Sequence, residues 1–168
     1  MTSHENEQFA LTSERAALEN FLDAQREGLI RKIEGLDDAT ARGTPTASSL
    51  SLLGLVKHAA TWERRWFQVV MGGRELPEQW PTVQTKPRDA DLMVDENDTV
   101  DHWVGYYREQ IEQSRAVAAS MDLDSPCARA DIIECNVRYV LFHMIEETAR
   151  HAGHADVIRE SLDGSRGI

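Results

Sequence analysis

The sequence predicts an all-α protein with four long helices, and two observations support this fold class. Four stretches repeat apolar residues at helical spacing, and none alternates polar and apolar residues as a half-buried strand would. The 168 residues are 41% hydrophobic and 28% charged, with only 10 Gly and 5 Pro, as is typical of globular proteins. The length favours one domain, so we expect residues 1–168 to form a single helical domain with a flexible start at residues 1–11.

The first predicted helix covers residues 12–36. Glu14 lies near its N-terminus, where the helix dipole favours an acidic side chain. The stretch "GLDDATARGTPTASS" that follows is rich in residues that end helices, so it predicts a connection. The predicted buried stripe of this helix contains Leu18, Phe21, Leu22, Gln25, Leu29 and Ile33.

The second predicted helix begins after a capping serine, Ser49 or Ser51, and ends at Met71 before Gly72 and Gly73. Serine side chains satisfy the free N–H groups at a helix start, and glycine readily ends a helix. The inward stripe of this helix contains Leu52, Leu55, Ala59, Trp62, Trp66 and Val69.

The stretch "GGRELPEQWPTVQTKPRDADLMVDEN" contains three prolines and has no helical period, which predicts a long loop. Roughly 26 residues, at up to ~3.3 Å each, can span the whole length of the preceding helix. The third helix can therefore begin at either end of the second. Four-helix bundles with such a long crossover between two helices are well known.

The last two predicted helices lie in the second half of the chain. The third begins after a cap at Asp98 or Thr99 and ends at Met121, and the fourth covers residues 132–162. The expected stripe of the third contains Trp103, Tyr106, Gln110, Val117 and Met121. The expected stripe of the fourth contains Val137, Leu141, Met144, Thr148, His151, Ala155, Ile158 and Leu162.

Charge and composition exclude several classes of partner. A net charge of −11 disfavours nucleic acids and anionic lipid surfaces. The start "MTSHENEQFALTSE" lacks the basic and apolar segments of a secretory signal, and no apolar run is long enough to cross a bilayer. We expect a cytoplasmic protein that binds neither nucleic acid nor membrane. Cys127 and Cys135 do not form a C-x-x-C motif, so we expect buried free thiols.

The stretch "HMIEETARHAGHAD" places several metal-binding residue types on one face of the last helix. At about 100° per residue, Glu147, His151 and His154 lie about 40°, 80° and 20° from His143. Met144, at about 100°, belongs to the apolar stripe. The polar face therefore borders the core, and a pocket can form at such a border.

Glu147 and His151 are four residues apart, a spacing that lets two helical side chains bind one ion. A third ligand must come from another helix, and His58 is the best candidate because it lies at the edge of the buried stripe beside Trp62. Two histidines and one carboxylate would leave one metal position open for water or substrate. A hydrogen-bonded core histidine at position 58 and a solvated polar face on the last helix would fit the same pattern.

Two known helical metal motifs are excluded. The H-E-x-x-H motif requires glutamate after the first histidine, but Met144 follows His143. Di-iron carboxylate bundles use Glu-x-x-His twice, whereas Thr148 stands three residues before His151.

The segments "SLLGLVKHAATWERRWFQVVMGG" and "HMIEETARHAGHADVIRE" together resemble the DinB superfamily, in an actinobacterial-type branch of unassigned function. This resemblance covers nearly the whole chain. It implies a four-helix bundle with a long crossover between the second and third helices, often dimeric, and a metal held by His58, Glu147 and His151. Glu147 replaces a histidine of many relatives and resembles the mycothiol-dependent maleylpyruvate isomerase branch. His154 stands where many relatives carry glutamine, so we expect it beside the metal rather than bound to it.

The resemblance implies a metal-dependent transferase or isomerase that joins a small-molecule thiol, such as mycothiol or bacillithiol, to an electrophilic substrate. We expect zinc, with nickel as the alternative, and a homodimer. A divalent metal with an open position stabilises a thiolate at neutral pH. Candidate residues for the pocket wall, for which core packing or solvent exposure is the simpler alternative, are His154, Trp62, Trp66, Tyr106 and Arg150.

Two other functions remain open from the sequence. Water in the open metal position would support a metal-dependent hydrolase. A closed site with four ligands, or no metal at all, would instead indicate a non-catalytic stress or interaction bundle.

Overall fold

The computed structural model describes residues 12–75 and 90–166, so the flexible start expected at residues 1–11 lies outside the described residues. These two ranges contain helices and connections but no β-strand, which confirms the all-α class. The long helices are α2 (Glu14–Ile33), α4 (Leu52–Glu63) continued by the π-helix η1 (Arg64–Met71), α5 (Val100–Ala119) and α6 (Val137–Asp163).

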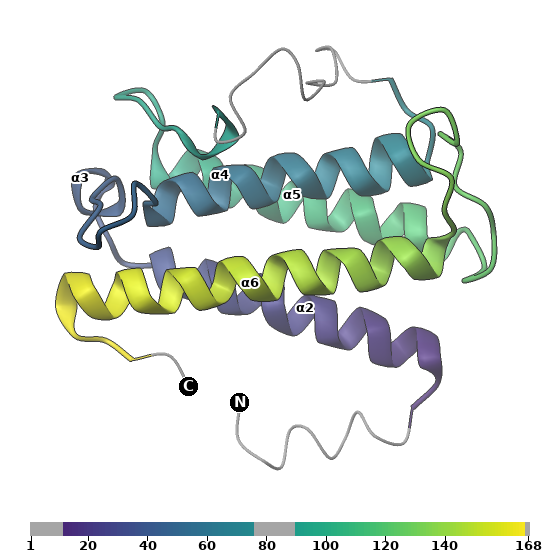
Figure 1. Cartoon of the computed structure of the whole chain (residues 1–168), viewed down its shortest axis with the longest axis horizontal. Helices are drawn as coiled ribbons and strands as arrows, with labels where there is room; N and C mark the ends of the chain where they lie inside the picture. The colour runs from purple at the N-terminus through teal and green to yellow at the C-terminus, as the bar shows by residue number, and fades with distance from the viewer. Residues whose placement is uncertain (1–11, 76–89, 167–168) are drawn as a thin grey trace.

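Two pairs of helices run side by side in the same direction. Glu14 at the start of α2 forms an ion pair of 2.7 Å with Arg138 at the start of α6. Lys32 near the end of α2 pairs with Asp156 of α6 at 2.6 Å, so these two helices are parallel. Figure 1 shows α4 and α5 running together in the opposite direction, which makes an up, down, down, up bundle.

The connection between η1 and α5 is the long crossover that the sequence predicts. It returns the chain along α4, because α5 begins beside the start of α4 (Figure 1). Lys57 near the start of α4 pairs at 2.9 Å with Asp98, just before α5. Residues 90–97 carry a single 3-10 turn, η2 (Ala90–Leu92), and residues 76–89 lie outside the described part.

Side-chain caps explain most helix starts. Of the two candidates for each cap, Ser51 rather than Ser49 accepts a hydrogen bond at the start of α4, and Thr99 rather than Asp98 does so for α5. The first predicted connection also contains one short helix, α3 (Asp38–Ala41), capped by the side chain of Asp37.

The prediction that the last helix begins at residue 132 was wrong, because α6 begins at Val137 with Asn136 as its cap. The preceding residues pair with other backbone instead: the Cys127 N–H donates to the Cys135 carbonyl at 2.9 Å, and the Val137 N–H donates to the Ser125 carbonyl at 3.1 Å. These non-local bonds satisfy backbone groups that a longer helix would have used internally.

Both cysteines are free thiols; Cys127 is buried and Cys135 half-buried.

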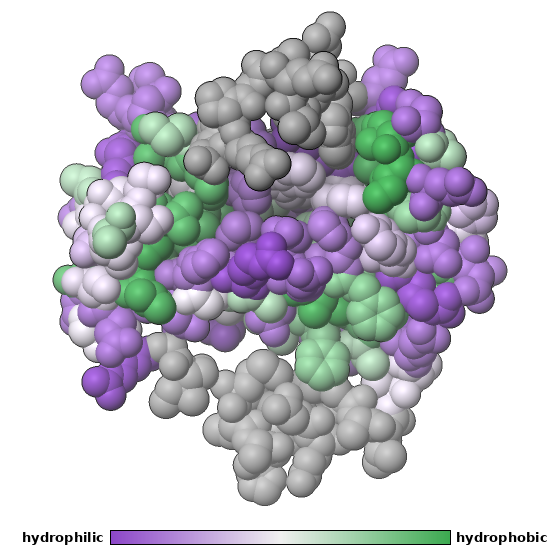
Figure 2. Space-filling model, in the orientation of Figure 1, coloured by the Kyte–Doolittle hydropathy of each residue, from purple (hydrophilic) through white to green (hydrophobic). Residues whose placement is uncertain are grey.

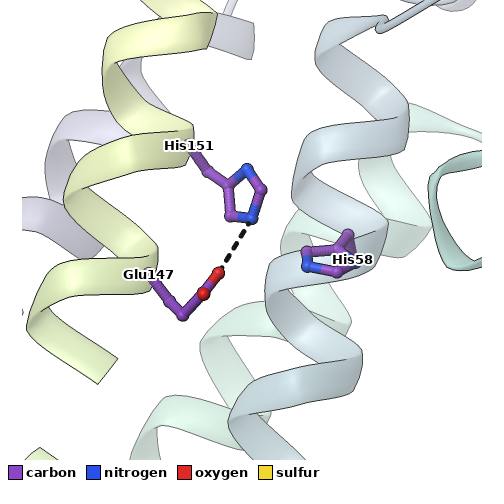
Figure 3. A group of neighbouring side chains, drawn as sticks. All are labelled: His58, Glu147 and His151. Atoms are coloured by element: carbon purple, nitrogen blue, oxygen red, sulfur yellow. Dashed lines mark ion pairs between the residues drawn. The ribbon is translucent and has the colours of Figure 1, made fainter. Parts of the chain in front are cut away.

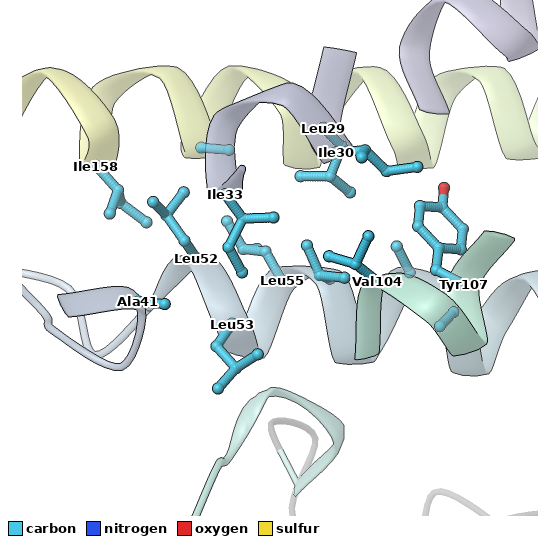
Figure 4. Close-up of a cluster of buried hydrophobic side chains, with 14 of the residues drawn as sticks. Leu29, Ile30, Ile33, Ala41, Leu52, Leu53, Leu55, Val104, Tyr107 and Ile158 are labelled. Atoms are coloured by element: carbon cyan, nitrogen blue, oxygen red, sulfur yellow. The ribbon is translucent and has the colours of Figure 1, made fainter. Parts of the chain in front are cut away.

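The core fills the space between the parallel pairs, as Figure 4 shows for one cluster of side chains from α2, α4, α5 and α6. The predicted stripe of α4 and η1 points inward, but the predicted stripe of α5 was displaced by about one residue. Trp103 and Tyr106 are only half-buried: the Trp103 Nε1–H donates to Asp98 at 2.6 Å, and the Tyr106 hydroxyl accepts from Arg64 at 3.1 Å. The residues of α5 that are buried are Val104, Tyr107, Gln110, Ile111, Ser114 and Ala118.

The π-helical turns of η1 enlarge the buried face of this helix. All residues from Arg65 to Met71 are buried, and the Gly72 N–H donates five residues back to the Phe67 carbonyl at 2.9 Å. A regular α-helix of this length would turn some of these side chains to solvent.

Among the described residues, no helix is long and apolar enough to cross a bilayer.

Candidate metal centre

His58, Glu147 and His151 converge between α4 and α6, as the sequence predicts. Each residue offers a ligand atom within 4.8 Å of those of the other two, and the two imidazole centroids are 4.7 Å apart. Figure 3 shows Glu147 and His151 projecting from α6 toward His58 on α4. This group is called the triad below.

Helical geometry explains why the triad forms at this point. Glu147 and His151 lie one turn apart, and their Oε2 and Nε2 atoms are 3.3 Å apart. His58 lies at the border of the buried stripe of α4, so it reaches α6 without entering the apolar core. All three side chains are half-buried, and the visible face of α6 carries a band of hydrophilic side chains (Figure 2).

Burial keeps both histidines of the triad neutral. Burial, assisted by the neighbouring His151, lowers the pKa of His58 to about 4. Burial also lowers the pKa of His151, although the Glu147 carboxylate opposes that shift. Neutral imidazole is the form that binds metal ions, so no proton has to leave either ring at pH 7.

Two unpartnered nitrogen atoms indicate that the triad fits a metal ion. Nδ1 of His58 and Nδ1 of His151 are buried, and neither has a hydrogen-bond partner among the described residues. Buried polar atoms without partners are rare and costly. Two imidazoles and a carboxylate form a donor set suited to a divalent metal, with a position left open.

Three of the predicted wall residues contact the triad. The Trp62 ring lies 5.7 Å from the His58 ring, and the exposed His154 ring lies 5.9 Å from that of His151. Arg150 is exposed and pairs with Glu147 at 3.3 Å. These three side chains therefore lie next to the triad.

Trp66 and Tyr106 contact other residues. The Trp66 ring packs at 4.2 Å on His143, one turn before Glu147 on α6, so it lies beside the site rather than on the triad. Tyr106 belongs to α5, where its ring contacts Trp103 at 5.6 Å.

Sequence reasoning did not find the charged pair beside His58. Arg65 is 2% exposed, forms an ion pair of 3.0 Å with Asp91 in η2, and lies over the Trp62 ring at 5.5 Å. Asp91 raises the pKa of His58, whereas Arg65 lowers it, which places both charges near this histidine. The one signal in the sequence is the pair of arginines within "TWERRWFQVV", a stretch with many apolar residues.

An up, down, down, up helical bundle with a triad of two histidines and one glutamate between its second and fourth long helices is DinB-like. The family model described as mycothiol-S-transferase matches residues 17–164, and the chain belongs to this family. The family match confirms the resemblance drawn from the segments around His58 and His151.

The solved structures include a protein of the same fold. A conserved protein from Enterococcus faecalis is 14% identical, with a TM-score of 0.68, and the alignment covers 92% of this chain and 99% of that one. At this identity the likeness shows the fold alone. The comparison with curated proteins found no significant match.

Proposed function

We propose that this protein is a metal-dependent thiol transferase, which takes mycothiol or a related small-molecule thiol and joins it to an electrophilic substrate. The observation that carries the proposal is the triad of potential metal ligands in a chain of the mycothiol-S-transferase family.

The proposed ligands of the metal are His58, Glu147 and His151, with zinc as the expected ion and nickel as the alternative. A divalent metal held there would lower the pKa of a bound thiol, so that the thiolate forms at neutral pH. Glu147 contributes one negative charge, and the two neutral histidines contribute nitrogen lone pairs. Because Glu147 leaves one positive charge of a divalent ion unbalanced, the site favours an anionic sulfur.

The residues around the triad have distinct proposed roles. Trp62 forms an apolar wall beside His58, which helps to exclude water from the reacting sulfur. Arg150 is exposed and forms a second ion pair, of 2.6 Å, with Glu146. Its guanidinium can therefore turn to bind a substrate carboxylate. His154 lies close enough to contact a bound thiol from the solvent side.

A small-molecule thiol suits the reducing cytoplasm, where we propose that the protein acts.

The geometry favours this proposal over a closed structural metal site. Among residues 12–75 and 90–166, no fourth His, Cys, Asp or Glu joins the triad within the same 4.8 Å. A structural zinc site usually has four protein ligands, whereas a catalytic one keeps an open position.

Metal content and thiol transfer test the proposal together. The untagged wild-type protein should bind about one divalent ion per chain, and His58→Ala and His151→Ala should each lose most of it. The same variants should lose mycothiol transfer to monobromobimane, in which the thiol sulfur displaces bromide and its proton passes to the buffer. His143→Ala is the matched control, because this half-buried histidine lies on the same helix, packs on Trp66 and is not a member of the triad.

Three outcomes are informative. Metal and transfer lost together in the triad variants, and retained in His143→Ala, would support the proposal. A wild-type protein that stays metal-free when zinc and nickel are supplied would refute the metal site. A metal-loaded protein that hydrolyses activated esters but transfers no thiol would refute the transferase in favour of a hydrolase.

A further inference from the structure

A cavity separate from the triad lies between α2 and α5. Its volume is about 240 Å³, and no triad residue lines it. In Figure 1, α6 lies in front of α2 and α4 in front of α5, which places this cavity behind the helices that carry the triad. Helices α2 and α5 are not among the closely packed pairs, which explains why space remains between them.

The ionic groups that line the cavity are already paired with protein partners. Asp23 binds Arg26 at 2.7 Å and Arg115 at 2.9 Å, and Arg26 also binds Glu63. Glu19 pairs with Arg15 in the same way, at 2.9 Å. The cavity therefore has no uncompensated charge for an ionic ligand, and the net charge of −11 further disfavours anions.

One buried polar group in the lining has no hydrogen-bond partner among the described residues. The hydroxyl of Ser114 is fully buried and makes no hydrogen bond within the described part of the chain. A hydroxyl can donate one hydrogen bond and accept others, and a buried one without a partner is costly. A ligand with a single hydroxyl would satisfy it.

Apart from the half-buried Asn20, the other uncharged residues of the lining are apolar, and the cavity is wide enough for a ring. Leu22, Phe67, Leu141 and Ala118 supply hydrocarbon and aromatic surface, and each is buried. A cavity of roughly 150 Å³ already admits benzene in an engineered protein, so this one has room for a substituted ring.

We propose that this cavity binds a neutral compound with one aromatic ring and one hydroxyl, for which phenol is the simplest probe. The ring packs on Leu22, Phe67 and Leu141, and the hydroxyl hydrogen-bonds to Ser114. The proposal is independent of the proposed function, because the cavity and the triad share no residue.

Titrations of the full-length protein with phenol and with toluene, followed by protein NMR, test this site. Both ligands should give saturable shifts centred on Ser114 and Leu22, with affinities in the range of about 0.1–10 mM expected for so small a ligand. Ser114→Ala should weaken phenol binding roughly three- to tenfold, the effect of one hydrogen bond. Toluene binding should change less than about twofold, because toluene makes no such bond.

Two more variants test whether phenol and toluene bind in this cavity or at the triad. Ala119→Phe fills the cavity from an exposed position, so the protein should fold and lose binding of both ligands. His58→Ala removes a triad residue and should leave phenol binding unchanged. Phenol binding that is lost in His58→Ala, or kept in both Ser114→Ala and Ala119→Phe, would overturn the proposal, as would the absence of saturable shifts.

Discussion

Arg26 and Glu63 place opposite charges inside the bundle, where their side chains are 4% and 0% exposed. Burial alone would lower the pKa of Arg26, but Glu63, Tyr107 and Asp23 together outweigh it, and the net pKa is raised. The same buried region contains Tyr107, whose hydroxyl lies near Thr148 of α6, and burial raises the pKa of this tyrosine. The interior therefore depends on matched charges as well as on apolar packing.

Removing one charge of this pair should destabilise the protein strongly. Glu63→Ala leaves the Arg26 guanidinium buried with only Asp23 as a carboxylate partner, so the free energy of unfolding should fall by ~3 kcal/mol. The double variant Arg26→Met with Glu63→Leu removes both charges and should recover most of this loss. Urea unfolding followed by circular dichroism measures each value.

An exposed ion pair between two helices is the control for this prediction. Arg108 and Glu34 pair at 2.7 Å with side chains 54% and 49% exposed, so Arg108→Ala should cost less than ~1 kcal/mol. If Arg108→Ala and Glu63→Ala lowered the free energy of unfolding equally, burial would not be what makes the Arg26–Glu63 pair important.

At the scale of single elements, the contact between α4 and η2 holds the end of the crossover near the triad. Gly54 on α4 lies so close to the Leu92 carbonyl that an added Cβ would be 2.2 Å from that oxygen. The same segment carries Asp91, which pairs with Arg65 beside His58. The absence of a side chain at Gly54 therefore helps to place Asp91.

Replacing this glycine should disturb both stability and the triad. Gly54→Ala forces η2 away from α4 and should lower the free energy of unfolding by ~1–3 kcal/mol. Displacement of Asp91 removes an interaction that raises the pKa of His58, so this pKa, measured by NMR without metal, should fall further.

Gly105 on α5 provides the matched control. No atom lies within 4 Å of a Cβ added there, and the residue is exposed in the helix. Gly105→Ala should therefore stabilise the protein by ~0.5–1 kcal/mol. A stabilising Gly54→Ala would show that η2 does not pack as described.

At the scale of the whole molecule, the triad joins the two parallel pairs of helices. His58 belongs to the pair of α4 and α5, and Glu147 and His151 belong to the pair of α2 and α6. An ion bound by all three would link the two halves of the bundle. The homodimer and the single domain expected from the sequence stay predictions.

Metal binding should consequently raise the stability of the whole bundle. A metal that binds only the folded chain adds ~2.7 kcal/mol at a free concentration about 100 times its Kd, so zinc should raise the melting temperature by several degrees. Calorimetry with zinc and with a chelator measures the difference. Glu147→Gln should reduce this gain and His143→Ala should keep it; an equal gain in both variants would place the ion elsewhere.

Residues close in sequence were predicted well because helical geometry alone relates them. The spacing of Glu147 and His151, the caps Ser51 and Thr99, and the inward stripe of α4 all follow from about 3.6 residues per turn and from unsatisfied N–H groups at helix ends. The choice of His58 as the third ligand depended on its place at the edge of a buried stripe, and the structure brings it to the other two.

Predictions that depended on distant partners were less accurate. Phe21 was expected in the core but is 45% exposed, while Arg26 is buried because Glu63 lies opposite it on another helix. The start of α6 was placed five residues early, because backbone pairing with residues 123–127 occupies the preceding segment.

The sequence by itself determined the helical class, the long crossover and two adjacent members of the triad, since periodicity and capping act within a few residues. Only the tertiary structure decided which face of α5 is buried, where Asp91 and Arg65 lie beside His58, and that a cavity remains between α2 and α5. These features depend on how side chains from separate helices fill space and balance charge. Interactions of that kind have no fixed spacing along the chain.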